Sequence, residues 1–181
     1  MSSNITIETE RLFLRPIQKD DAKSVFHYRS DSFTNKYQGW IPTTIDDVVN
    51  FIENRVSPII DINGTWFQFV IITKEDNKIV GDLGLHFFDS DNKQVEIGCT
   101  IDKNCQKKGY ASEALSEIFR YLFTTLNKHR IMASIDPRNE GSIRLVKTLG
   151  FRHEAHFKES ILIDGKWVDD LVYAILNKEW T

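Results

Sequence analysis

Cysteine is scarce in this sequence, which contains only Cys99 and Cys105 among its 181 residues. Two cysteines six positions apart match neither a disulfide framework nor the ligand spacing of a metal site. Proteins without structural disulfides are typical of reducing compartments. We therefore expect a metal-free protein of the cytoplasm.

Long apolar runs and an excess of basic residues are also missing. No stretch approaches the length that crosses a membrane. The N-terminus, MSSNITIETERL, has no basic region followed by an apolar run, so no signal peptide is expected. The formal net charge is −3, whereas a general nucleic-acid-binding protein needs a basic face. These absences argue against membrane and nucleic-acid partners.

The composition is that of an ordinary globular chain, with 41% hydrophobic and 27% charged residues. A chain of 181 residues is long enough to bury a core without disulfides or metals. The sequence contains no internal repeat, linker or low-complexity segment. We expect one domain that spans residues 1–181.

The stretch from Val95 to Leu126 organises the expected fold. Apolar residues alternate at its start, which predicts a strand. Counted from Ala111, the later apolar residues recur at offsets of 3, 4, 7, 8, 11, 12 and 15, which predicts a helix that begins near Gly109. A further short strand, HRIMASI, follows this helix. A strand–helix–strand passage of this kind favours parallel pairing of the two strands.

Periodicity and turn signals predict the other elements. We expect an α/β domain with a mixed, mostly antiparallel sheet flanked by helices, in the order βααβββαβαββ. Asp164-Gly165 is a strong signal for a hairpin turn. The expected strands are Ile5–Ile17, Trp66–Thr73, Lys78–Phe88, the strand from Val95, His129–Ile135, Phe151–Asp164 and Lys166–Leu176, and the expected helices lie around residues 22–29, 48–56, 109–126 and 143–149.

The segment from Gln106 to Ala111 connects the organising strand to its helix. Small residues at Gly109 and Ala111 let a ligand approach the backbone. The unpaired N–H groups and the dipole of a helix N-terminus attract anions, and Lys107 and Lys108 add positive charge. Two interpretations compete here, namely an ordinary surface loop with a solvated lysine pair and a cradle for a pyrophosphate.

The same segment resembles a family motif. Gln-x-x-Gly-x-Ala after a strand that ends in EIGCTI, with EAL in the helix, is similar to the acetyl-CoA motif of GNAT N-acetyltransferases. Further segments resemble the RimJ/RimL branch, which acetylates the N-termini of ribosomal proteins. These segments are ETERLFLR with Asp21-Ala22, NEGS at residues 139–142, LGF at residues 149–151, and DLVY with Glu179-Trp180.

The resemblance implies acetyl-CoA as co-substrate and a set of residues that hold it. Backbone amides from Lys107 to Ser112, with the Gln106 side chain, would bind the phosphates. The strand at Cys99–Ile101 would pair with the pantetheine arm, and one of its amides would polarise the thioester oxygen. Asn139 would hydrogen-bond the arm. The full predicted cofactor set is Cys99, Thr100, Ile101, Gln106, Lys107, Lys108, Gly109, Tyr110, Ala111, Ser112 and Asn139.

Three residues are candidates for catalysis. Glu96 lies opposite the apolar face of its strand and resembles the general-base glutamate of many GNAT enzymes, although a salt-bridged surface glutamate is the alternative. Glu159 is the second candidate, because the RimJ/RimL branch uses a glutamate from that region. Ser142 resembles the serine that protonates the departing thiolate, and it could also cap a helix. Many GNAT enzymes use a tyrosine as the general acid, and this sequence has Val146 at that position, so that role is missing.

These features predict an N-acetyltransferase that moves an acetyl group from acetyl-CoA to a primary amine by direct attack in a ternary complex. The favoured acceptor is a protein N-terminal α-amine. The alternatives are a small amine, such as a polyamine, an amino sugar or an antibiotic, and a catalytically silent acyl-CoA-binding module. A negatively charged groove around the Phe33–Ile41 loop would favour polyamines. The last hairpin could support a homodimer.

Overall fold

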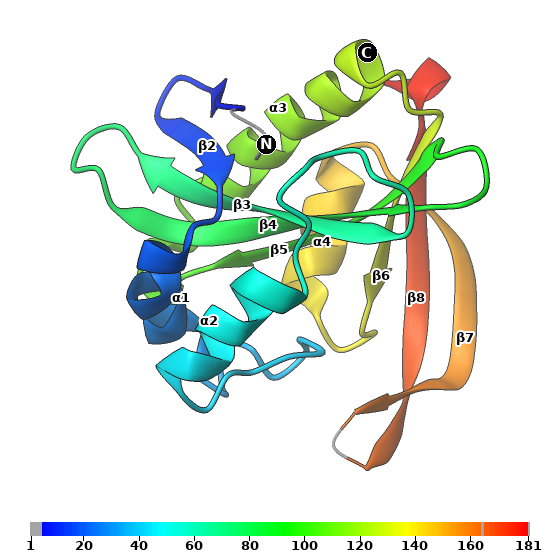
Figure 1. The fold of residues 1–181 in the computed structure, drawn as a ribbon. Coiled ribbons are helices and arrows are strands. Elements are labelled where there is room, and N and C mark those ends of the chain that lie inside the picture. The colour runs from blue at the N-terminus through cyan, green and yellow to red at the C-terminus, as the bar shows by residue number, and fades with distance from the viewer. Residues whose placement is uncertain (1–4, 164, 181) are drawn as a thin grey trace.

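The computed structural model describes residues 5–163 and 165–180, which form a mixed sheet with helices on both faces (Figure 1). The strands of the described residues lie in the spatial order β1-β2-β3-β4-β5-β6-β8-β7. Neighbouring strands pair antiparallel except β5 and β6, which are parallel. The predicted fold class and parallel pair are therefore confirmed, and so is the element order except that the first predicted strand is divided.

The strands are β1 (Ile7–Glu8), β2 (Leu12–Pro16), β3 (Thr65–Thr73), β4 (Ile79–Phe88), β5 (Gln94–Ile101), β6 (Arg130–Ile135), β7 (Arg152–Ile163) and β8 (Lys166–Leu176). The helices are α1 (Ala22–Arg29), α2 (Ile45–Asn54), α3 (Tyr110–Arg120) and α4 (Glu140–Thr148). A π-helical turn at Tyr121–Thr125 extends α3. The chain then leaves the helix at Asn127, whose φ is +51°.

The first predicted strand is divided in two, because a turn separates β1 from β2. The Thr9 hydroxyl oxygen accepts a hydrogen bond from the Leu12 amide at 2.9 Å, and the Thr9 amide donates to the Leu12 carbonyl at 2.9 Å. The prediction of one continuous strand from Ile5 to Ile17 was wrong for this reason. The turn brings Arg11 against the start of α3, which matters for the site below.

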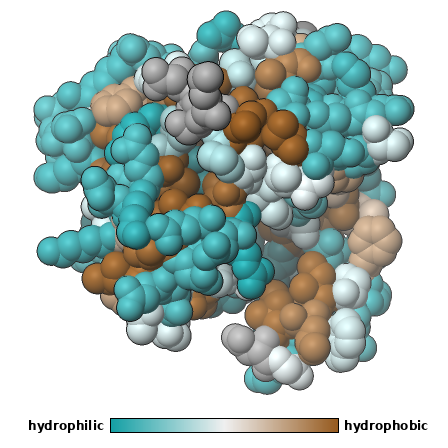
Figure 2. Space-filling model, viewed as in Figure 1, coloured by the Kyte–Doolittle hydropathy of each residue, from teal (hydrophilic) through white to brown (hydrophobic). Residues whose placement is uncertain are grey.

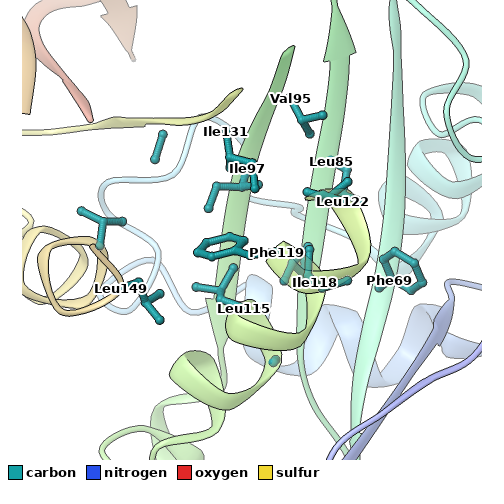
Figure 3. Packing of buried hydrophobic residues seen from close by; sticks show 14 of the residues in the cluster. Phe69, Leu85, Val95, Ile97, Leu115, Ile118, Phe119, Leu122, Ile131 and Leu149 are labelled. Atoms are coloured by element: carbon teal, nitrogen blue, oxygen red, sulfur yellow. The ribbon is translucent and has the colours of Figure 1, made fainter. Parts of the chain in front are cut away.

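Two apolar cores fill the space between the helices and the sheet. The larger core lies under α3 and α4, and its central side chains are 0 to 1% exposed. Figure 3 shows side chains of α3 and of the π-helical turn after it pointing at the strands beneath them; Leu115, Ile118 and Phe119 of α3 and Leu122 of the turn lie against Phe69, Leu85, Val95 and Ile97. The smaller core joins α1 and α2 to the opposite face. The period of 3.6 in α3 and of 2 in β5 therefore places α3 on the sheet.

The parallel pairing between β5 and β6 covers only three residue pairs, from Gln94–Arg130 to Glu96–Met132. Beyond Glu96, β6 continues beside β8 as far as Ile135, while β5 stays paired with β4 as far as Ile101. The two central strands therefore diverge, and from Ile97 onward no strand of residues 5–163 or 165–180 pairs with this edge of β5. This divergence creates the space that the site occupies.

The β7–β8 hairpin extends beyond the rest of the sheet (Figure 1). It carries exposed apolar side chains at Phe157, Leu162 and Trp167, and apolar surface is visible on this hairpin in Figure 2. Ile163 pairs with Lys166 across the turn. Of the predicted turn residues, Gly165 has a φ of +74° and Asp164 lies outside the described residues. The homodimer through this hairpin stays a prediction.

Within the described residues, no helix is long and apolar enough to cross a membrane.

Candidate active site

A cleft of about 530 Å³ lies between the free edge of β5, the N-terminus of α3 and the first turn of α4; we call it the α3 cleft. It brings together most of the cofactor-binding residues predicted from the sequence. Those that line it are Cys99, Thr100, Ile101, Gln106, Lys107, Gly109, Tyr110, Ala111, Ser112 and Asn139, together with Ser142. Lys108 is the member of the predicted cofactor set that does not line the cleft.

The backbone at the start of α3 is arranged to hold an anion. Gly109 is the N-cap with a φ of +84°, a left-handed conformation that glycine adopts readily. The first hydrogen bond of the helix runs from the Glu113 amide to the Gly109 carbonyl at 3.0 Å. The amides of Tyr110, Ala111 and Ser112 therefore precede this bond and have no helical partner. Three such N–H groups with the helix dipole form an anion site.

Arg11 braces this loop, and its sequence position gave no sign of that role. Its guanidinium donates to the Lys108 carbonyl at 3.0 Å and to the Glu113 carboxylate at 2.7 Å, and it lies 4.9 Å from the centre of the Tyr110 ring. The Thr9 hydroxyl donates to the other Glu113 oxygen at 2.5 Å. About 100 residues separate these partners in the sequence, so only the fold brings them together.

Gln106 makes a contact within the protein that the sequence did not predict. Its side-chain amide donates to the Ile101 carbonyl at 3.0 Å. This bond ties the loop to the end of β5 and uses one of the two N–H groups of the amide. Gln106 also lines the α3 cleft, and its contact with a phosphate stays a prediction.

The free edge of β5 presents backbone groups to the α3 cleft. The Asp102 amide donates to Val80 of β4 at 2.9 Å. Because backbone groups alternate in direction along a strand, those of Cys99 and Ile101 face away from β4. The Gln106 bond to the Ile101 carbonyl agrees with this direction. A ligand lying along this edge could therefore pair with β5 as a neighbouring strand would.

The Cys99 thiol is not suited to act as a nucleophile. Burial, with a smaller contribution from the Asp82 carboxylate, raises the pKa of Cys99 to about 12. The thiol therefore stays protonated at neutral pH, and a protonated thiol is a poor nucleophile.

Asn139, and not Ser142, caps α4. The Asn139 side-chain oxygen accepts a hydrogen bond from the Ser142 amide at 3.2 Å. The alternative role of Ser142 as a helix cap is therefore wrong. Ser142 lines the α3 cleft beside Asn139, where its hydroxyl could reach a ligand.

A second cleft, also of about 530 Å³, lies over the other face of β4 and β5; we call it the α2 groove. Three consecutive rows of side chains cross the strands here, because the register pairs them. The middle row, Gln68, Gly84 and Gly98, lines the groove, and two of its members have no side chain. Trp40, stacked on Phe51 with 4.5 Å between ring centres, forms part of its wall. Gln38 lines both clefts.

The row on one side of this floor contains a buried carboxylate, that of Asp82. Asp82 is 1% exposed and accepts hydrogen bonds from the Tyr28 hydroxyl at 2.6 Å, from Arg29 at 2.5 and 2.8 Å, and from the Gln68 amide at 2.6 Å. A buried carboxylate needs such partners to offset its desolvation. From the sequence alone, no role was assigned to Asp82 or to its three partners. The signals that could have identified them were a charged residue, Asp82, and a glutamine, Gln68, in otherwise apolar strands.

Glu96 lies in the row on the other side of the floor. Its carboxylate is 3.4 Å from His86 Nδ1, and its side chain is 28% exposed. His86 in turn stacks on Trp66 with 4.7 Å between ring centres. Two residues of strand place Glu96 about 7 Å from Gly98. Glu96 therefore lies just beyond the end of the groove, on the same face of the sheet.

Glu159 is remote from this arrangement. It lies in β7 within an irregular stretch of the β7–β8 pairing, with a φ of +45°. It is exposed, and its amide donates to Asp169 at 2.9 Å. Glu159 lines neither the α3 cleft nor the α2 groove.

Comparison with known proteins agrees with this geometry. The chain matches the acetyltransferase (GNAT) domain model over residues 11–152. It is 32% identical over 179 residues to the uncharacterized N-acetyltransferase p20 of Bacillus licheniformis, covering 97% of this chain and 98% of that protein. It is 28% identical over 182 residues to the ribosomal protein uS5-alanine N-acetyltransferase of Escherichia coli, covering 98% and 93%.

The fold is also similar to the crystal structure of a GNAT-family acetyltransferase from Bacillus anthracis. The TM-score is 0.86 at 32% identity, and the match covers 97% of this chain and 100% of that chain. The chain belongs to the GNAT family. It is an N-acetyltransferase that uses acetyl-CoA as its co-substrate.

Replacing Gly109 should remove the anion site. A Cβ atom at Gly109 would lie 3.2 Å from Arg11 Nη2, and a φ of +84° strains a β-branched residue. We expect Gly109→Val to weaken CoA binding at least tenfold in calorimetry. Gly64→Val is the matched control, because Gly64 has a φ of +76° with nothing within 4 Å of its Cβ position. Equal CoA affinity in the two variants would contradict the assignment.

The Glu113 brace should make stability depend on pH. Partial burial alone would raise the pKa of Glu113, but hydrogen bonds from Thr9 and Arg11 outweigh it and lower that pKa below its usual value. A lowered folded-state pKa stabilises the fold above the unfolded value, about 4.3, and this stabilisation is lost as the pH falls through the folded pKa.

We expect Glu113→Gln to reduce the free energy of unfolding at pH 7 by about 1 kcal/mol, a modest value because Arg11 is half exposed. Denaturant unfolding of both proteins from pH 7 to pH 3 measures this. The difference should shrink as the pH falls, and a constant difference would show that the carboxylate charge is not its source.

Proposed function

We propose that this enzyme acetylates the α-amine of a protein N-terminus, with the amine bound in the α2 groove and acetyl-CoA in the α3 cleft. The similarity to the uS5-alanine enzyme of Escherichia coli supports a protein acceptor. The two clefts lie on either side of β5 and share Gln38. A ternary complex would thus bring the two substrates together across one strand, which suits direct transfer.

The charge of the α2 groove is the observation from which we infer the class of acceptor. In the described part of the chain, its charged lining residues are Arg29, Asp47 and Arg55. Hydrogen bonds from the Thr43 hydroxyl and from the amides of Thr43 and Thr44 lower the pKa of Asp47 to about 2, and all three bonds go to its Oδ2 atom. Two arginines and one carboxylate give this lining a net positive charge, which disfavours a polyamine, while its aromatic walls and amide groups suit a peptide.

The chemistry assigns one step to each predicted residue. Glu96, directly or through one water, would take a proton from the ammonium group. The nitrogen then attacks the thioester carbon, so a carbon–nitrogen bond forms and the carbon–sulfur bond breaks. An amide on the free edge of β5, at Cys99 or Ile101, would stabilise the negative charge on the carbonyl oxygen. The Ser142 hydroxyl would hydrogen-bond the departing thiolate, which takes up the second proton that the nitrogen loses as the amide forms. Asn139 would hold the pantetheine arm.

The acceptor class is tested by following thiol release from acetyl-CoA. We compare a peptide that begins with alanine, the same peptide with a blocked N-terminus, and spermidine. Thiol release with the free peptide, but not with the blocked peptide or with spermidine, would support the proposal. Preferential turnover of spermidine would favour the small-amine alternative. The absence of thiol release with every amine tested would favour a catalytically silent binding module.

Replacing Glu96 separates the two candidate bases. We expect Glu96→Gln to lower kcat by a factor of about 10² to 10⁴, because the amine then stays protonated, while acetyl-CoA affinity changes little. Steady-state kinetics and calorimetry measure the two quantities. Glu159→Gln is the comparison: a loss of turnover in that variant instead would transfer the role to Glu159.

Filling the groove should block the acceptor selectively. A Cβ atom at Gly98 has no heavy atom within 4 Å, so a side chain there would project into open space over the floor without strain. We expect Gly98→Val to raise the KM for the acceptor at least tenfold, with CoA affinity within twofold of the wild type. An unchanged KM would place the acceptor elsewhere.

A further inference from the structure

Gln68 is a polar residue in an otherwise apolar central strand, and it is only 4% exposed. Its side-chain NH₂ donates to Asp82 Oδ1 at 2.6 Å. Burying the Gln68 side-chain amide costs free energy unless its polar atoms are hydrogen-bonded, whereas an apolar residue would pack there without that requirement.

Asp82 fixes which way this amide points. The carboxylate is paired with Arg29 and also accepts from the Tyr28 hydroxyl. A paired carboxylate can accept hydrogen bonds but cannot donate them. Gln68 must therefore turn its NH₂ toward Asp82 and its carbonyl oxygen away. The oxygen and nitrogen of the amide are thus distinguished by the network.

The carbonyl oxygen of Gln68 lies over the floor of the α2 groove. A Cβ atom at Gly84 would be only 2.8 Å from Gln68 Oε1, so the oxygen occupies the space that the missing side chain leaves. Among the described residues, no donor contacts this oxygen, and it is not enclosed in the core. The groove therefore contains an oriented hydrogen-bond acceptor beside Gly98.

We infer that Gln68 Oε1 binds the amine of the acceptor substrate, and that Asp82 and Arg29 are positioning residues that keep this oxygen aimed at it. The inference rests on the proposed function and identifies the group that recognises the amine. After Glu96 removes one proton, a primary amine retains two N–H groups and one lone pair. A hydrogen bond from one N–H to Gln68 leaves the lone pair available for the thioester carbon.

The test measures coupling between Gln68 and the amine. Calorimetry on the CoA complex gives the affinity for a peptide that begins with alanine and for its desamino analogue, in which hydrogen replaces the amine. The wild type should prefer the amine, and Gln68→Met should reduce that preference about tenfold, as expected for the loss of one hydrogen bond. Structural damage alone would lower both affinities equally and leave their ratio unchanged.

A matched pair of glycine variants tests the same oxygen without removing it. Gly84→Ala brings a methyl group to 2.8 Å from Gln68 Oε1 and to 3.2 Å from the Trp66 ring, so it displaces the flexible end of the Gln68 side chain. Gly98→Ala adds a methyl group across the register, where it meets nothing within 4 Å. We expect Gly84→Ala to lose the amine preference, whereas Gly98→Ala should weaken binding of both peptides without changing their ratio.

Equal affinity of the wild type for the two peptides, binding of neither peptide, or an unchanged preference in Gln68→Met would overturn the inference. The proposed function fails by a different observation, namely the absence of acetyl transfer to any peptide amine by the wild type. A wild type that acetylates the peptide while Gln68→Met keeps its preference would leave the proposed function standing and remove Gln68 from it.

Discussion

The separation of β5 from β6 is the constraint on which both clefts depend. Parallel pairing stops after Glu96–Met132, so the backbone groups of Cys99 and Ile101, which face away from β4, have no neighbouring strand among the described residues. Unpaired backbone groups are stable only where water or a ligand can reach them. The divergence of β5 and β6 therefore leaves one edge of β5 open to solvent in the middle of a large sheet. The N-terminus of α3, with its own unpaired amides, lies beside that edge, so one ligand can satisfy both sets of groups.

The opposite face of the same strands is organised by one buried charge. Asp82 holds Tyr28 and Arg29 of α1 against the sheet and holds Gln68 beneath the groove. Removing one partner would leave a buried charge or an unpaired donor, which is far more costly than losing a surface ion pair. The network thus joins helix packing to the shape of the groove floor.

The two substrates of this GNAT enzyme would be recognised by different physical means. The α3 cleft relies on backbone amides, a helix dipole and a glycine with positive φ, which suit a phosphate ligand regardless of side-chain identity. The α2 groove relies on aromatic walls, oriented amides and the two glycines of its floor. Specificity for the acceptor therefore depends on side chains, and the loops that carry many of them can vary without altering the cofactor cleft.

The sequence by itself determined the order of elements after the first strand and the parallel pair, and it identified most of the residues that line the α3 cleft, because each depends on local periodicity and on the turn chemistry between neighbouring elements. The continuous first strand was wrong because a turn at Thr9 competes with it. Only the tertiary structure decided that Arg11 braces the cradle, that Asn139 rather than Ser142 caps α4, and that Asp82 aims Gln68 into the groove. The contacts of Arg11 and of Asp82 join residues far apart in the chain, and a side chain's role there depends on which partners the fold brings within hydrogen-bond distance.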